Sequence, residues 1–96
     1  MFILHVDLFV KPKMNEVLER IYGSVFGPAI SQQPGFSETR LLRPIAAEGN
    51  TYRLVIAFVN EKSQKEWVAT DLHQEVWPQI EALLDRYSVH PFEAVG

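Results

Sequence analysis

The segment FILHVDLFV, residues 2–10, decides the fold, and YRLVIAFV, residues 52–59, extends the same pattern. Each segment reads as a β-strand with apolar side chains on both faces, because side chains alternate between the two faces of a strand. In the first segment one face carries Phe2, Leu4, Val6, Leu8 and Val10, and the other carries Ile3, His5, Asp7 and Phe9. Two helical segments cannot cover both faces of a sheet built from such strands. The sequence therefore predicts a second copy of the chain on the uncovered face.

This homodimer is expected to join the helix-free faces of two sheets into a closed barrel. We expect Val6 and Leu8 to lie in the interface, since without a partner they and their neighbours on residues 52–59 would face water. A charge there, as in Leu8→Glu, is then expected to destabilise the dimer by several kcal/mol. Asp7, on the other face of the strand, is expected to point towards the helices.

The composition indicates one soluble domain over residues 1–96. There is no cysteine, which excludes disulfides and thiolate chemistry and is typical of a reducing cytoplasm. No apolar stretch approaches the roughly 20 residues of a membrane span, and the first residues lack the features of a targeting segment, so no membrane partner is expected. The net charge is −3 without a basic cluster, so nucleic acid is not an expected partner either.

Helix and strand signals alternate after the first strand. Apolar residues recur at helical spacing over residues 14–26, and Gly27 and Pro28 are expected to end this helix. Residues 36–43 read as a second strand, and Gly49-Asn50 signals a hairpin into residues 52–59. These two strands are expected to be antiparallel neighbours.

The second helical region is expected to form two pieces. Ser63 and Glu66 match a capping box at its start, with Asn60 as the other candidate cap, and Thr70 can cap the second piece. Proline disrupts helix hydrogen bonding, so the later Pro78 predicts a break near residues 70–72 or a kink near Trp77.

The second piece is expected to carry, on one face, His73, Trp77, Ile80, Leu84 and Tyr87. Residues 89–95 read as a last strand, and Pro91 favours an edge position for it. The resulting order, β-α-β-β-α-β, is that of an α+β ferredoxin-like fold. Right-handed crossovers place both helices on one face of its four-stranded antiparallel sheet.

Two sets of polar residues are candidates for chemistry. His5 and Asp7 share a strand face. Either one or both of them lie near a sheet end and hydrogen-bond to backbone, Arg53 or Arg40, or Asp7 lines a pocket, where it accepts a substrate proton or holds a substrate hydroxyl. His73 shares a helical stripe with aromatic residues, which pack in a core more often than they bind ligands. The functional alternative is a flat cavity for an aromatic ligand, in which Asp7 and His73 are catalytic. Its substrate-binding wall is expected to comprise Trp67, Trp77, Tyr22, Phe26, Phe9 and His5.

In such a pocket, desolvation would raise the pKa of Asp7 and a nearby imidazolium would lower it. His5, Asp7 and His73 also form a two-histidine, one-carboxylate set, but the spacing matches no known metal motif and no metal is expected. No phosphate-binding loop, nucleophile elbow or zinc-protease motif is present.

Three further features carry a family resemblance. They are Pro34-Gly35-Phe36 before the second strand, Tyr52 and Phe58 within the third, and WVATDLH at residues 67–73. With its β-α-β-β-α-β order, nearly the whole chain resembles the antibiotic-biosynthesis-monooxygenase family of dimeric α/β barrels. That family includes cofactor-independent oxygenases of polycyclic phenols and quinols, haem-degrading oxygenases and members of no known function.

The haem-degrading branch has an Asn late in strand one, a Trp in the second helical region and an iron-ligating His ten residues later. The matching positions here hold Asp7, Trp67 and Trp77, so the resemblance lacks the iron ligand and haem degradation is disfavoured. The cofactor-free branch needs a dry aromatic pocket, a base and room for dioxygen. Asp7, His73, Trp67 and Tyr22 are the residues expected to supply that environment.

The leading hypothesis is therefore a monooxygenase without a cofactor, acting on an aromatic, quinol-like or polyketide small molecule. The alternative is a non-catalytic dimeric α/β-barrel protein that binds a small molecule or serves a structural role. An RNA-recognition module has the same element order, but RLVIAFVN, residues 53–60, lacks its basic-glycine-aromatic signature and the chain is acidic.

Overall fold

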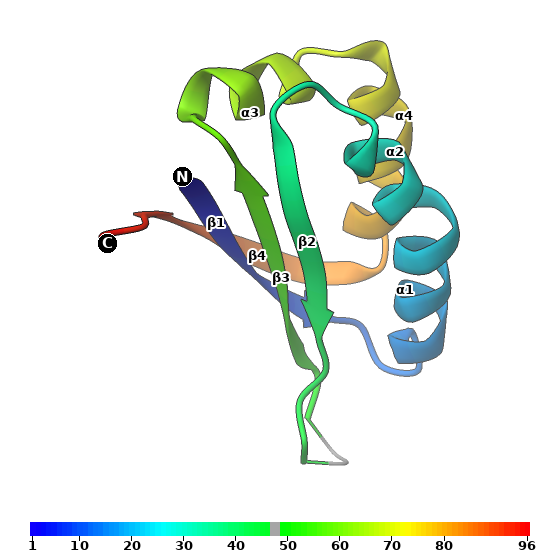
Figure 1. The fold of residues 1–96 in the computed structure, drawn as a ribbon. Helices are drawn as coiled ribbons and strands as arrows, with labels where there is room; N and C mark the ends of the chain where they lie inside the picture. The colour runs from blue at the N-terminus through cyan, green and yellow to red at the C-terminus, as the bar shows by residue number, and fades with distance from the viewer. Residues whose placement is uncertain (47–48) are drawn as a thin grey trace.

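The computed structural model describes residues 1–46 and 49–96. Its elements, in chain order, are β1 (Phe2–Val10), α1 (Asn15–Ile21), the π-helix η1 (Tyr22–Phe26), α2 (Gly27–Ser31), β2 (Phe36–Leu42), β3 (Thr51–Phe58), α3 (Glu61–Val68), α4 (Asp71–Glu81) and β4 (Leu84–Glu93). The four strands form one antiparallel sheet in the order β2-β3-β1-β4. The helices cover one side of this sheet, and the two chain ends lie on the other side of the view (Figure 1). The predicted ferredoxin-like architecture is confirmed, with the second helix split in two.

The covered face of the sheet is the opposite of the one predicted. Val6 and Leu8 are buried within one chain, under the helices, at 4% and 0% exposure. They pack there with buried residues of the helices such as Phe26 and Ile80. The prediction that Val6 and Leu8 lie on the helix-free face is therefore wrong. Asp7 is instead on that face, paired in register with Arg53 of β3.

Charge pairing gives the physical reason for this orientation. The aliphatic side of β1 adjoins the aliphatic side of β3, so burying both together under the helices removes the most apolar surface from water. The other side of β1 carries His5 and Asp7, and the ionic partners of Asp7 project from the same side of the neighbouring strands. An unpaired carboxylate under the helices would be far more costly than a paired one at the surface.

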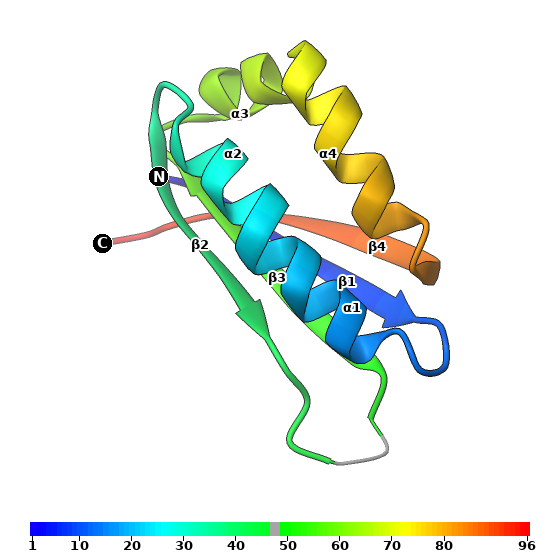
Figure 2. The same cartoon turned by 90° about the vertical axis from the view of Figure 1, so that its right-hand side faces the viewer.

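The first helix does not end at Gly27-Pro28. It continues through η1 and α2 to Ser31, and Figure 2 shows this helical run lying beside α4 across the sheet. The Gly27 N–H donates to the Tyr22 carbonyl five residues earlier, the spacing of a π-turn. Pro28 falls in the first turn of α2, where the missing N–H of proline costs little.

The structure revises one of the two cap predictions for the second helical region and confirms the other. Asn60, not Ser63, caps α3, because the Ser63 N–H donates to Asn60 Oδ1 at 2.9 Å. Thr70 caps α4 as predicted, with the His73 N–H donating to Thr70 Oγ1 at 3.1 Å. The break near residues 70–72 is confirmed, and Pro78 is accommodated inside α4.

The last strand begins earlier than predicted and ends before residue 95. Because α4 ends at Glu81, Leu84 and Tyr87 belong to β4 rather than to the helix face on which they were predicted. The edge position of this strand is confirmed, and it is where Pro91 is tolerated. The antiparallel pairing of β2 with β3 is confirmed, whereas their predicted hairpin includes residues 47 and 48, which lie outside the described part of the chain.

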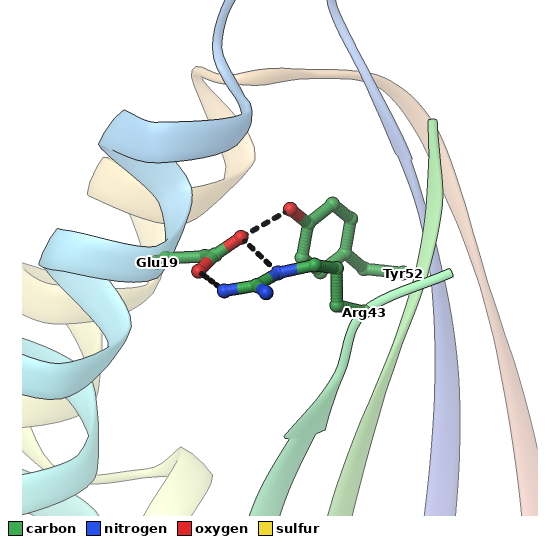
Figure 3. A network of polar contacts seen from close by, with 3 residues as sticks. All are labelled: Glu19, Arg43 and Tyr52. Carbon is green, nitrogen blue, oxygen red and sulfur yellow. Dashed lines mark hydrogen bonds and ion pairs between the residues drawn. The ribbon is translucent and has the colours of Figure 1, made fainter. Parts of the chain in front are cut away.

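A three-residue polar network fastens α1 to the far end of the β2–β3 pair. Figure 3 shows Glu19 of α1 meeting Arg43, which follows β2, and Tyr52 of β3. Arg43 Nε donates to Glu19 Oε2 at 2.8 Å, and the Tyr52 hydroxyl donates to the same oxygen. These two hydrogen bonds lower the pKa of Glu19 from 4.5 to about 2. Burial, followed by the contact with Glu19, raises the pKa of Tyr52.

We expect Leu8→Ala to lower the free energy of unfolding by about 2–5 kcal/mol, because it leaves a cavity under the helices. Urea unfolding measures this, with Leu72→Ala as the control, since Leu72 is 37% exposed on α4 and lies away from the helix-free face. Equal stability of the two variants would contradict the burial of Leu8 within one chain.

The Glu19 network predicts an acid-sensitive part of the stability. A carboxyl whose pKa is depressed in the folded state stabilises the fold fully above its unfolded pKa, and this contribution disappears as the pH falls to the folded pKa. For Glu19 the loss falls between pH 4.5 and about 2. Urea unfolding at neutral pH and midway through this window should show a smaller acid loss in Glu19→Gln than in the wild type. An identical loss would exclude the network as its source.

Candidate functional site

A cavity of about 250 Å³ lies between the helices and the sheet. Its helix side is formed by η1, α3 and α4, and its sheet side by β1, β3 and the edge strand β4. The lining consists of Leu4, Val6, Phe26, Leu54, Ile56, Gln64, Trp67, Val68, His73, Trp77, Tyr87 and Val89. Small-molecule pockets range upward from about 300 Å³, so this volume suits a ligand of one or two aromatic rings.

Aromatic rings form much of the cavity wall. Phe26 contacts Trp67 and Trp77 edge to face, with ring centroids 6.3 and 6.5 Å apart. Trp77 also meets Tyr87 at 5.2 Å, and the His73 ring lies 5.1 Å from Trp67. Edge-to-face pairs of this kind are favourable and hold the rings in defined orientations. The wall is therefore rigid, apolar and suited to a flat ring.

Local sequence signals position these side chains. The Thr70 cap starts α4 with His73 in its first turn, directly across the helix break from Trp67 of α3. The π-turn sets the direction of Phe26, since its wider ring of backbone atoms rotates the residues that follow it. Wide turns of this type occur frequently at functional sites.

His73 is the titratable group on the helix side of the cavity. Burial lowers its pKa below the ordinary 6.5, because the apolar surroundings disfavour the charged ring. The imidazole is therefore neutral at neutral pH. In that form one ring nitrogen accepts a hydrogen bond and the other donates one.

The structure brings together four of the predicted site residues. Trp67, Trp77, Phe26 and His73 all line the one cavity. Tyr22 stacks on Phe26 at 6.2 Å from outside the cavity, and its hydroxyl donates to Thr39 Oγ1 at 3.3 Å. Tyr22 therefore supports the wall without lining it.

The other three predicted residues lie on the helix-free face of the sheet. Asp7 accepts a hydrogen bond from Arg53 Nε at 2.9 Å and lies 3.4 Å from His90 Nε2. The Arg53 hydrogen bond, as the largest cause, lowers the pKa of Asp7, whereas the predicted pocket would have raised it. The prediction that Asp7 and His73 share a pocket is therefore wrong. The pairing of Asp7 with Arg53, the other possibility weighed for it, is confirmed.

His5 and Phe9 also lie outside the cavity. The His5 ring lies 5.1 Å from Phe92 of β4. The Arg86 guanidinium lies 3.6 Å over the Phe9 ring, a cation–π contact. Both residues therefore shape the helix-free face and do not form the wall predicted for them.

Within residues 1–46 and 49–96, no group of three His, Asp or Glu side chains is arranged to hold a metal ion. The set of His5, Asp7 and His73 does not converge, since the sheet separates His73 from the other two. In the same part of the chain, no helix is long and apolar enough to cross a membrane.

Among the cavity residues that were not predicted as site residues, two carry polar groups, Gln64 and Tyr87. Tyr87 was assigned to a helix, whereas it lies in β4, pairs in register with the buried Leu8 of β1 and contacts Trp77. Gln64 contributes a polar amide to the lining, and its exposed surroundings in the sequence EKSQKE gave no sign of this.

A second, wider depression of about 420 Å³ lies at the end of the sheet where β1 begins. Met1, Phe2, Val59 and Phe92 are among its lining residues, and none of the predicted site residues is. The aromatic cavity is therefore the candidate site.

The chain matches the family model described as antibiotic biosynthesis monooxygenase over residues 1–78. It belongs to this family. The matched region contains every element that forms the helix side of the cavity, up to Pro78 in α4. No curated protein matches the chain.

Solved structures of low sequence identity have the same fold. The cofactor-independent oxygenase SnoaB from Streptomyces nogalater, solved as a variant, is 18% identical with a TM-score of 0.84, over 97% of this chain and 91% of that one. A protein from Nitrosomonas europaea assigned to the same family is 14% identical with a TM-score of 0.84, covering 100% of both chains. A conserved protein from Methanosarcina mazei is 13% identical with a TM-score of 0.81, over 95% of this chain and 89% of that one.

Proposed function

We propose that the chain is a monooxygenase that needs no cofactor and acts on a small, electron-rich aromatic molecule such as a phenol or quinol. The observation that carries this proposal is the apolar cavity with aromatic walls and a neutral histidine on its rim. Family membership and the likeness to a cofactor-independent oxygenase support the same assignment. The absence of cysteine suits action in a reducing cytoplasm.

The proposed reaction draws all of its electrons from the substrate. A phenol and dioxygen give a quinone and water: one oxygen atom becomes the new ring carbonyl, and the other leaves as water with the two hydrogens that the ring and the hydroxyl lose. The protein has to hold the ring, exclude water and assist proton movement at the substrate oxygen. A rigid aromatic cavity with one imidazole meets these requirements.

The geometry disfavours haem degradation as the alternative within the family. The position at which the resemblance requires an iron-ligating histidine holds Trp77, whose indole is part of the aromatic wall. An indole N–H is a donor without a free lone pair for iron.

A non-catalytic binding role is the second candidate. The observation that favours it is the small number of titratable side chains in the lining, namely His73 and Tyr87. Binding without turnover would show as tryptophan fluorescence quenching by phenols without oxygen uptake, because Trp67 and Trp77 border the ligand.

Activity is tested by screening phenols and quinols for oxygen uptake without added flavin or metal. For any substrate found, we expect His73→Ala to lower kcat/KM by roughly 10²-fold, the typical loss when a proton-handling group is removed. Leu72→Ala is the matched control, because Leu72 adjoins His73 on α4, is 37% exposed and does not line the cavity.

Two outcomes would contradict this assignment. Equal activity of His73→Ala and the control would remove His73 from the reaction. Loss of activity in Asp7→Asn, with His73→Ala unaffected and both variants folded, would locate the chemistry on the helix-free face instead.

We also propose that two copies of the chain pair through the helix-free face of the sheet. Apolar side chains remain on that face without cover from the helices. They include Ile3, Leu42 and Phe92, whereas Val55 and Ala57 on the same face are already buried within one chain. Leu42 and Phe92, on the two edge strands, are 45% and 53% exposed, so a partner would remove substantial apolar surface from water.

This pairing predicts that Phe92→Glu gives a folded monomer. The exposed Phe92 tolerates a charge in one chain, whereas a dimer interface would bury that charge without a partner. Sedimentation at micromolar concentration measures the assembly, and circular dichroism checks the fold. Leu72→Glu on the helix side is the control and should remain dimeric. A monomeric wild type, or a dimeric Phe92→Glu, would exclude this interface.

A further inference from the structure

The side chain of Gln74 bridges the helix break to the ring of His73. Gln74 Nε2 lies 3.1 Å from the Val68 carbonyl oxygen at the end of α3 and 3.4 Å from His73 Nδ1. A carbonyl oxygen only accepts hydrogen bonds, so the Gln74 atom beside it must be the amide nitrogen and not the amide oxygen. The contact with Val68 therefore fixes the orientation of the whole amide.

The same nitrogen carries a second hydrogen, which it can donate to Nδ1 of the His73 ring at 3.4 Å. Nδ1 of that ring can accept this hydrogen only if Nδ1 itself carries no proton. A neutral imidazole has one protonated nitrogen, so the proton of His73 must then be on Nε2. No hydrogen bond of Nε2 occurs within residues 1–46 and 49–96, and Nε2 is thus the ring nitrogen available to a ligand in the cavity.

We propose that Gln74 is a positioning residue that holds His73 in the Nε2–H form, so that the cavity presents a hydrogen-bond donor to its ligand. The ligand class follows from this: an uncharged aromatic molecule with an accepting oxygen, such as a ring carbonyl or the oxygen of a phenol or enol. His73 then steadies negative charge that develops on this oxygen, as preorganised donors do in other active sites. The part that concerns turnover rests on the function proposed above, whereas the state of the ring does not.

The surroundings of His73 are consistent with a neutral donor. Burial disfavours its protonated form, and the Gln74 amide would meet a second N–H at Nδ1 if the ring were charged. From the sheet side the titratable lining group is the Tyr87 phenol, and no carboxylate, lysine or arginine side chain of the described residues lines the cavity. The Asp7 carboxylate lies across the sheet, paired with Arg53.

Nitrogen-15 NMR of the ring nitrogens tests the proton position in the resting full-length protein. Protonated and unprotonated ring nitrogens resonate far apart, so the wild type should show His73 with Nε2 protonated and Nδ1 unprotonated. Gln74→Glu replaces the donor with an acceptor, which should move the proton to Nδ1 and raise the pKa of His73.

Gln79→Glu is the matched control for this variant. Gln79 lies on the same helix, is exposed like Gln74, and donates its amide to a backbone carbonyl at the same 3.1 Å distance, but it does not contact His73. It should leave the His73 resonances unchanged. A wild-type ring protonated on Nδ1, or a Gln74→Glu ring that keeps the wild-type pattern, would overturn the proposal.

The ligand class is tested with acetophenone and ethylbenzene. The two molecules differ only in that acetophenone has a carbonyl group where ethylbenzene has a methylene group. One neutral hydrogen bond is worth about 1 kcal/mol, so acetophenone should bind about fivefold more tightly in an NMR titration. Gln74→Glu should abolish the preference, and Gln79→Glu should retain it. Equal affinity of the two ligands in the wild type would overturn the donor role.

These readouts separate the proposal from the proposed function. A chain that shows the Nε2–H ring and the acetophenone preference, but never consumes oxygen, contradicts the oxygenase assignment and leaves the donor role intact. A chain that consumes oxygen but has the His73 proton on Nδ1 contradicts the donor role and leaves the oxygenase assignment intact.

Discussion

The fold of this protein depends on which face of strand β1 packs against the helices and which face remains exposed. One face is entirely apolar and includes Val6 and Leu8, whereas the other mixes apolar residues with His5 and Asp7. Burying a carboxylate costs several times what burying a leucine gains, so the mixed face remains on the outside. This choice fixes the side on which the helices dock and leaves the aromatic cavity between the helices and the aliphatic side of the sheet.

The cavity remains open because the large side chains around it cannot move to fill it. The helix break capped by Thr70 turns α4 away from α3, and Trp67 and Trp77 occupy the two sides of the resulting space. Large rings in edge-to-face contact cannot rotate to fill it without losing those contacts. Tyr87 and Val89, on the edge strand β4, are 40% and 50% exposed, so the cavity opens to solvent beside this strand.

The sequence predicted the order of elements, the antiparallel strand pairs, the Thr70 cap and the grouping of Trp67, Trp77, Phe26 and His73. These features follow from the spacing of residues that are close together in the sequence, so they can be predicted without a structure. The choice between the two faces of β1 could not be predicted this way, because strand alternation defines two faces without saying which one the helices cover. That choice rests on partners distant in sequence, such as Arg53, which lies 46 residues from Asp7.

The same separation limits the chemistry available in the cavity. With Asp7 held ionised by Arg53 on the far face, no carboxylate of the described lining can draw a proton from a ligand. A neutral imidazole of lowered pKa is a weak base, so it cannot ionise an unreactive ring. In the function proposed above, the ligand therefore brings its own reactivity, as an acidic hydroxyl or an electron-rich ring, and the protein contributes orientation and the hydrogen bond of His73. With His73 as the proposed donor, a cavity with so few polar groups would select ligands by their shape and by the position of an accepting oxygen.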